Sequence, residues 1–217
     1  KDADAKKICL VKNLLVNLEI STKNEIVKNA LKIKPNFICI VPENRMEVTT
    51  EGGLNLKKNL KKLKKIIKKF KHKKIRTSLF VNPSIEDIKI SKNLDVDCIE
   101  IHTGEFSNLI KSKRNIKNEF NRIKRCSKLA NKIGLEVHAG HGLDYRSTRI
   151  LSKINEIQEF NIGHFIIGES IFYAVLIQIS CPKELWEGSR KNICYFCFGF
   201  MGTQDRTPGH ARLGQCL

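Results

Sequence analysis

The sequence alternates short apolar runs with longer helical patterns, and this alternation restricts the fold more than any other feature. Each run precedes a segment with helical spacing of its apolar residues; the runs cover residues 14–20, 37–41, 77–81, 98–102, 135–138 and 160–164. Strands that are apolar on both faces are typical of a parallel sheet covered by crossover helices. The pattern therefore predicts an α/β fold built from six βα units, spaced by roughly 30 residues.

Polar side chains at the predicted strand ends favour a (β/α)-barrel over a doubly wound sheet. A carboxylate or imidazole lies at or just past the C-terminal end of several strands, at Glu19, Glu43, Glu100, His102 and His141. In a barrel these ends form the catalytic rim. We expect an incomplete (β/α)8 TIM-type barrel over residues 1–180, because six units cannot close an eight-stranded barrel.

The charge balance is strongly basic, with 40 Lys and Arg against 22 Asp and Glu and a formal net charge of +18. Such a balance favours an anionic partner such as a phosphorylated substrate, nucleic acid or an acidic membrane. Many of the lysines lie between Leu56 and Lys74, where apolar residues recur at helical spacing at Leu56, Leu60, Leu63, Ile66, Ile67 and Phe70. This pattern predicts a solvated outer helix. The composition of an AT-rich genome is the simpler source of the lysines, so we expect neither nucleic acid nor a membrane as partner.

The apolar runs are too short for a membrane span, and the first residues lack the apolar stretch of a signal peptide. Hydrophobic residues make up 41% of the chain, as in ordinary globular proteins. We therefore expect a cytoplasmic protein.

The composition changes after Ser180, and residues 181–217 are predicted to be a Cys-rich tail of uncertain origin. The spacing of Cys194, Cys197, His210 and Cys216 would suit a tetrahedral zinc site. Few apolar residues between Cys197 and His210 are available to build a folded unit around the metal. We expect no bound metal and no cofactor, with zinc in the tail as the less favoured alternative.

Several motifs carry more polar chemistry than packing requires. Asn17–Glu19 and Glu100–Gly104 place pairs of polar side chains on one face of a strand. His138–Leu143 presents His141 between two glycines, where a substrate could approach an acid–base group that titrates near neutral pH. Asn161–His164 puts a glycine at a strand-to-helix turn, where phosphate groups commonly bind. Together these motifs indicate acid–base chemistry on a phosphorylated carbonyl compound.

Four runs, VPENRMEVTTEGGL (41–54), EIHTG (100–104), HAGHGL (138–143) and NIGH (161–164), resemble the pyridoxine 5'-phosphate synthase family in order and spacing. The resemblance extends to about residue 175. It implies a cytoplasmic (β/α)-barrel enzyme of transferase type without a cofactor, typically an octamer. Such enzymes condense 3-amino-2-oxopropyl phosphate with 1-deoxy-D-xylulose 5-phosphate and release phosphate and water.

The resemblance also implies roles for individual residues. Glu19 would accept protons, His141 would donate them, and Glu100 would stabilise the transition state. Contacts to the phosphorylated substrates would come from Thr49, Gly142, Gly163 and His164.

The sequence departs from the family at both ends. Members begin with two further strands, the first with an Asn-x-Asp-His motif and the second with a His and arginines, and Lys1 falls in the helix after them. The tail replaces their C-terminal helix. Three alternatives follow: an inactive remnant of the enzyme, a basic RNA- or membrane-binding fragment, or a metal-dependent hydrolase using His102, His138 and His141.

Overall fold

The structure is a computed structural model that describes residues 2–42, 52–176, 192–194 and 198–200. Its centre is a curved sheet in which every paired neighbour runs parallel. The six predicted strands form its continuous middle part: β1 (Asn17–Ile20), β2 (Phe37–Ile40), β3 (Arg76–Val81), β4 (Cys98–His102), β5 (Glu136–Gly140) and β6 (Ile157–Asn161). They neighbour one another in chain order, as expected for successive βα units.

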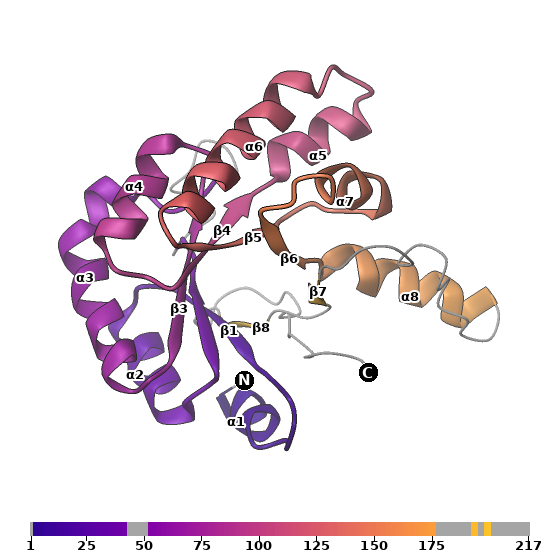
Figure 1. Ribbon diagram of the computed structural model, residues 1–217. Coiled ribbons are helices and arrows are strands. Elements are labelled where there is room, and N and C mark those ends of the chain that lie inside the picture. The colour runs from indigo at the N-terminus through magenta and orange to yellow at the C-terminus, as the bar shows by residue number, and fades with distance from the viewer. Residues whose placement is uncertain (1, 43–51, 177–191, 195–197, 201–217) are drawn as a thin grey trace.

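Helices alternate with these strands, and most of them cover the outer, convex side of the sheet, whereas the last one, His164–Leu176, extends away from it (Figure 1). They are α1 (Asp2–Cys9), α2 (Asn24–Ile33), α3 (Leu56–His72), α4 (Ile85–Asn93), α5 (Gly104–Lys111), α6 (Lys117–Lys132), α7 (Tyr145–Leu151) and α8 (His164–Leu176). The hydrophobic core lies between sheet and helices and includes the fully buried Phe70, Phe106 and Phe160. Burial of such side chains contributes about 1.5–3 kcal/mol each.

Two short strands from the segment assigned to the tail extend the sheet, which the sequence did not predict. β7 (Asn192–Cys194) pairs with β6, and β8 (Phe198–Phe200) pairs with β1, both in parallel. The strand order is β7-β6-β5-β4-β3-β2-β1-β8, so β7 and β8 are the two edges. The described strands therefore form a curled sheet that does not close, and the predicted incomplete barrel is confirmed.

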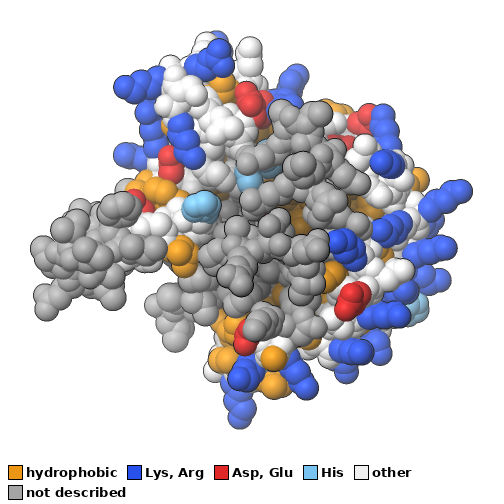
Figure 2. Space-filling view, turned by 180° about the vertical axis from the view of Figure 1, so that it is seen from behind, with side chains coloured by type: hydrophobic (Ala, Val, Ile, Leu, Met, Phe, Trp, Pro, Cys, Tyr) orange, Lys and Arg blue, Asp and Glu red, His pale blue; other side chains and the backbone are white. Residues whose placement is uncertain are grey.

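The lysine-rich segment forms α3, an outer helix as predicted. Leu63, Ile66, Ile67 and Phe70 are buried against the sheet, whereas Leu60 is 43% exposed and does not belong to the buried face. Lys and Arg side chains gather along the edge of the molecule where α3 lies (Figure 2). Lys57 pairs with Glu86 of α4 at 2.8 Å, which links neighbouring helices. No described helix is both long and apolar enough to cross a membrane.

Candidate active site

The carboxyl ends of the parallel strands lie at one edge of the curled sheet, here called the rim, and carry the predicted catalytic carboxylates. Glu19 on β1 is in register with Cys39 on β2, so their side chains share a face. The Cys39 thiol donates to Glu100 Oε2 of β4 at 3.6 Å. Burial raises the pKa of Cys39 well above its usual range, and the nearby charges of Glu100 and Glu19 raise it further. A neutral thiol therefore separates two acidic side chains from different strands.

Glu100 is held on both of its oxygens. Its side chain is buried, with a residue exposure of 4%, and Oε2 also accepts a hydrogen bond from Asn161 Nδ2 of β6 at 2.6 Å. Oε1 packs against Gly140 of β5 so closely that a Cβ on Gly140 would overlap it. The carboxylate is thus fixed by neighbours on β2, β5 and β6, and its orientation is preorganised for electrostatic work.

His141 follows β5 directly and lies at the exposed top of the rim. Its ring stacks on that of His102, the last residue of β4, with centroids 4.8 Å apart and planes inclined by 28°. Because His102 follows Glu100 by two residues, both point to the same face of β4. His141 therefore sits above a column formed by His102 and Glu100, which brings the predicted proton donor and stabilising carboxylate to one part of the rim.

The loop after β5 adopts an unusual backbone. His141 has φ = 81° and Gly142 has φ = 74°, both in the left-handed region. That region favours glycine, and a histidine there needs support from its surroundings. Gly142 packs beside Ser107 of α5, where an added Cβ would come within 3.3 Å of the Ser107 Cβ. The loop presents the Gly142 backbone at the rim without a side chain to cover it.

Gly163 and His164 lie where β6 passes into α8, as the sequence predicted. His164 begins the helix and is exposed, while the Gly163 carbonyl accepts a hydrogen bond from Ile167 N at 3.1 Å. The first N–H groups of a helix have no intrahelical acceptor, which suits them to an anion such as phosphate. Asn161, two residues earlier on the same strand, contacts Glu100. The turn is therefore adjacent to the column of catalytic candidates.

Thr49 and Glu43 lie outside the described residues. The chain beyond Thr49 is anchored at the rim: Gly53 N donates to Asn82 Oδ1 at 2.8 Å, and Leu54 N donates to the Phe80 carbonyl at 2.8 Å. A Cβ on Gly53 would lie 2.5 Å from Asn82 N, so this close approach requires glycine. The described residues that follow the Thr49 segment thus pack against the carboxyl end of β3.

A second polar cluster lies on the same face of the sheet as Glu100, from the middle of β5 and β6 down to the amino ends of β3 and β5. His138 of β5 is 2% exposed; its Nε2 lies 2.8 Å from Glu136 Oε1 and its Nδ1 lies 3.4 Å from Glu159 Oε1. Arg76 of β3 pairs with the other oxygen of Glu136 at 2.8 Å. The hydrogen bonds from His138 and Arg76 lower the pKa of Glu136 to about 2, against an opposing effect of burial. This cluster ties β3, β5 and β6 together.

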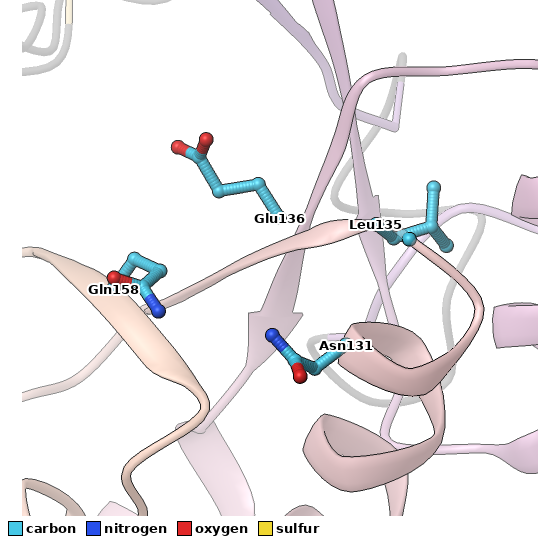
Figure 3. Close-up of a pocket in the computed structure, with 5 residues that line it drawn as sticks. Asn131, Leu135, Glu136 and Gln158 are labelled. Atoms are coloured by element: carbon cyan, nitrogen blue, oxygen red, sulfur yellow. The ribbon is translucent and has the colours of Figure 1, made fainter.

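A pocket of about 420 Å³ opens beside that cluster. It is lined by Asn131 from the end of α6, by Gly134, Leu135 and Glu136 before and at the start of β5, and by Gln158 of β6 (Figure 3). These residues lie at the opposite end of the strands from Glu100 and His141. The pocket is therefore separate from the candidate active site.

Comparison with known proteins identifies the family. The model of the family described as "Pyridoxal phosphate biosynthesis protein PdxJ" matches residues 1–185. The chain belongs to the PdxJ family. Individual members agree: "Pyridoxine 5'-phosphate synthase" of Pelagibacter ubique is 60% identical over 185 residues, covering 85% of this chain and 77% of that relative.

More distant PdxJ relatives give the same result. The protein of the same name from Aliarcobacter butzleri is 44% identical over 206 residues, covering 85% of this chain and 79% of the relative. That of Sulfurihydrogenibium sp. is 41% identical over 179 residues, covering 82% and 73% respectively. The alternatives of a nucleic-acid-binding fragment and of an inactive remnant are not favoured by these similarities.

Within the described ranges, no group of three or more His, Cys, Asp or Glu side chains could hold a metal ion. The three histidines of the hydrolase alternative are divided, because the His138 ring lies between Glu136 and Glu159 while His102 and His141 stack on each other at the rim. Of the tail residues considered for zinc, Cys197, His210 and Cys216 lie outside the described residues.

The structure adds residues that the sequence did not assign to the site. Cys39 has no role in the sequence-based prediction, Asn161 belongs there only to the NIGH motif, and His102 is placed at the rim and in the hydrolase alternative but not among the synthase residues. Asn161 follows Glu159 by two residues on β6, and His102 follows Glu100 in the same way on β4. This period of two places each of them on the inner face, but only the structure shows which carboxylate or ring each one touches.

Proposed function

We propose that this protein is a pyridoxine 5'-phosphate synthase that joins 3-amino-2-oxopropyl phosphate to 1-deoxy-D-xylulose 5-phosphate, releasing phosphate and water. The observation that carries the proposal is the convergence of Glu19, Glu100 and His141 at one rim, with Cys39 between the two carboxylates. The identity of 60% to a relative of that name supports it. The names of the relatives indicate the product, and the resemblance of the four motifs to the family indicates the two substrates.

The reaction needs an acid and a base that act several times. Joining an amine to a ketone expels water, which requires protonation of the departing oxygen and removal of a proton from nitrogen. Closing the ring requires a base that removes a proton from a carbon beside a carbonyl. Glu19, half-buried on β1, is suited to accept protons, and His141, exposed at the rim, is suited to donate them.

Glu100 is assigned a different role because it is buried, its Oε2 already accepts two hydrogen bonds, and its Oε1 packs against Gly140. A fixed carboxylate stabilises the positive charge that develops on nitrogen as the C=N bond forms. It can do so without exchanging protons itself. Its hydrogen bond from Asn161 and its contact with Gly140 keep it in place during the reaction.

Both substrates carry phosphate, and the proposed binding residues offer backbone N–H groups and small side chains. We assign Gly163 and His164, at the start of α8, to one phosphate group. Thr49 and the Gly142 backbone are assigned to the sugar phosphate. The strongly basic chain, with a net charge of +18, favours the approach of such anionic substrates.

The proposed enzyme is a cytoplasmic transferase that uses neither a metal nor another cofactor. By analogy with the family, it forms a homo-oligomer of eight chains. Multi-angle light scattering of the purified protein tests the oligomer: a mass near that of eight chains supports it, and a monomer contradicts it.

Turnover of the two phosphorylated substrates tests the proposal. The assay uses the 217-residue chain and, in parallel, the same chain extended by the two N-terminal strands that the family resemblance implies. Glu19→Gln and His141→Ala should each lower kcat by roughly 10²- to 10⁴-fold while the circular dichroism spectrum stays unchanged. Glu25→Gln and His72→Ala, which alter exposed helix residues, are the matched controls. Full activity in Glu19→Gln or His141→Ala would contradict the assigned roles.

A further inference from the structure

We propose that His102 and Thr103 are positioning residues for His141, which they hold by its ring and by its backbone respectively. This inference rests on the proposed role of His141 as proton donor, and it adds two residues to which the mechanism above assigns no part. Both lie at the junction of β4 and α5, one strand away from the residue that they support.

His141 needs outside support because its own backbone is strained. Its φ of 81° lies in the left-handed region, and the next residue, Gly142, has φ = 74°. Two successive residues in this region form a tight reversal that costs a non-glycine residue on the order of 1 kcal/mol or more. The loop is also exposed, so packing from within the loop cannot hold the ring in one direction.

Thr103 supports the backbone of this reversal. Its hydroxyl lies 2.7 Å from the Gly140 carbonyl and 2.9 Å from the His141 carbonyl and shares its one proton between them, and its N–H donates to the Gly140 carbonyl at 2.9 Å. The residue is fully buried, with 0% exposure, so water cannot replace these bonds. The two carbonyls lie on either side of the φ angle of His141. The hydroxyl thus fixes the peptide planes that set the direction of the His141 side chain.

His102 supports the ring. Its imidazole stacks on that of His141 with centroids 4.8 Å apart. Phe80 of β3 packs edge-on against both rings, at 5.3 Å from His102 and 6.3 Å from His141. His102 is 6% exposed, so it cannot turn away from this stack without leaving the packed interior. His102 and Phe80, whose ring planes meet at 85°, therefore form a corner in which the exposed imidazole rests on the face of His102.

Gly104 completes the arrangement by leaving room for it. A Cβ at this position would lie 2.7 Å from His102 Cε1 and 3.0 Å from His141 Cδ2. Three consecutive residues, His102, Thr103 and Gly104, therefore each shape the position of His141. A proton donor must keep a constant distance and angle to its acceptor, and a displacement of about 1 Å can cost roughly 100-fold in rate. Rigid support of this kind is what a donor on an exposed loop requires.

The test compares paired substitutions that keep or remove each contact. His102→Phe keeps a flat ring, whereas His102→Leu removes it; Thr103→Ser keeps the hydroxyl, whereas Thr103→Val removes it at nearly constant volume. We expect kcat to fall by roughly 10- to 100-fold in His102→Leu and Thr103→Val, with KM for both substrates within about threefold of the unmodified value. His102→Phe and Thr103→Ser should stay within about threefold of the unmodified kcat.

Thr77→Val is the matched control for loss of a buried hydroxyl. The Thr77 hydroxyl bonds to Asp97 at 3.1 Å and is equally buried, but it lies at the amino end of β3, away from the rim. This variant should lose stability and keep its kcat. A decrease in kcat equal to that of Thr103→Val would show that general destabilisation, and not positioning, explains the effect.

A second readout does not depend on turnover. In protein labelled with ¹³C-histidine, the His141 Cε1–H resonance should carry a ring-current shift from His102, and it should move and broaden in His102→Leu and Thr103→Val. The inference is overturned if the His141 resonance is unchanged in both His102→Leu and Thr103→Val, or if both variants keep the kcat of the unmodified protein. Equal losses in His102→Phe and His102→Leu also overturn it, because the ring nitrogens and not the stack would then matter. Retained activity in His141→Ala refutes the proposed function instead, which separates the two failures.

Discussion

Asn161 Nδ2 on β6 donates a hydrogen bond of 2.6 Å to Glu100 Oε2 on β4, across the intervening strand β5. This bond joins the NIGH motif to the EIHTG motif, although the two residues are 61 positions apart in the chain. It fixes the carboxylate to which we assign transition-state stabilisation. The side chain of Asn161 is itself buried, so the bond is shielded from water.

Loss of this bond should lower activity. Asn161→Ala removes a hydrogen bond to a charged group, worth about 2 kcal/mol, and we expect kcat to fall by roughly 30-fold. Asn161→Asp instead places a second carboxylate beside Glu100. Its kcat should rise as the pH is lowered from 8 to 6, because a proton shared between the two acids restores a hydrogen bond.

The control for Asn161→Asp is Asn131→Asp, the same change at an exposed residue of the pocket at the opposite end of the strands. Its pH–rate profile should match that of the unmodified protein. A profile for Asn161→Asp that also matches would contradict the part assigned to the bond between Asn161 and Glu100.

Gly140 leaves the space that Glu100 occupies. Gly140→Ala would place a Cβ onto Glu100 Oε1 and push the carboxylate from its site. We expect kcat to fall by roughly 100-fold, with a loss of stability of about 1–3 kcal/mol from overpacking. Gly168→Ala in α8, where an added Cβ meets nothing within 4 Å, should change neither quantity adversely. Steady-state kinetics measure kcat, and urea unfolding measures stability. If Gly140→Ala keeps the kcat of the unmodified protein, the position of Glu100 is not critical.

Asp144 caps α7 directly after the loop that carries His141. Its carboxylate accepts a hydrogen bond from Ser147 N at 2.7 Å, and the Ser147 hydroxyl accepts one from Asp144 N at 2.8 Å. Asp144→Ala should lower the free energy of unfolding by about 1 kcal/mol. Ser84→Ala at the cap of α4, where the bond to Asp87 N is 3.4 Å long, should cost less. Urea unfolding of both variants makes the comparison, and a larger loss in Ser84→Ala would contradict it.

Glu136 should make stability depend on pH in the acid range. Its pKa is lowered from 4.5 to about 2 by its bonds to His138 and Arg76. A lowered pKa in the folded state means that the group stabilises the fold above pH 4.5 and that this contribution disappears as the pH falls toward 2. Because the side chain is 36% exposed, solvent screening reduces the effect, and we expect about 1 kcal/mol at pH 7.

Glu136→Gln isolates this contribution. Its free energy of unfolding should lie below that of the unmodified protein at pH 7, and the difference should shrink as the pH is lowered through 4 to 3. Exposed Glu25→Gln should show no comparable trend. A difference between Glu136→Gln and the unmodified protein that stays constant from pH 7 to 3 would contradict the role of the charge.

Much of this arrangement could be predicted from the sequence because parallel βα units impose simple rules. Apolar runs located β1 to β5, whereas the sixth run, 160–164, shares only Phe160 and Asn161 with β6, which begins at Ile157 among polar residues. Parallel pairing then required Glu19, Glu100 and His141 to meet at one rim. The helix α5 was missed because it begins at Gly104, a poor helix former, directly after β4. Pairing of β7 and β8 with the sheet edges was also missed, since the segment from Cys181 onward shows no periodicity.

The contacts within the site required the structure. Stacking of His141 on His102 depends on a positive φ at His141, which a histidine rarely adopts and which no local pattern indicates. The bond between Asn161 and Glu100 depends on how β4, β5 and β6 stagger, including a shift in register between Val137 and His138. Residue type and period place side chains on a face, but strand stagger decides which of them touch.

The most direct test of the account supplies 3-amino-2-oxopropyl phosphate and 1-deoxy-D-xylulose 5-phosphate to the purified protein and measures pyridoxine 5'-phosphate and inorganic phosphate together. Two forms of the protein are compared, with and without the two family strands at the N-terminus. The account predicts that the two products appear in equal amounts and that His141→Ala forms neither. Absence of pyridoxine 5'-phosphate from both forms of the protein would contradict it.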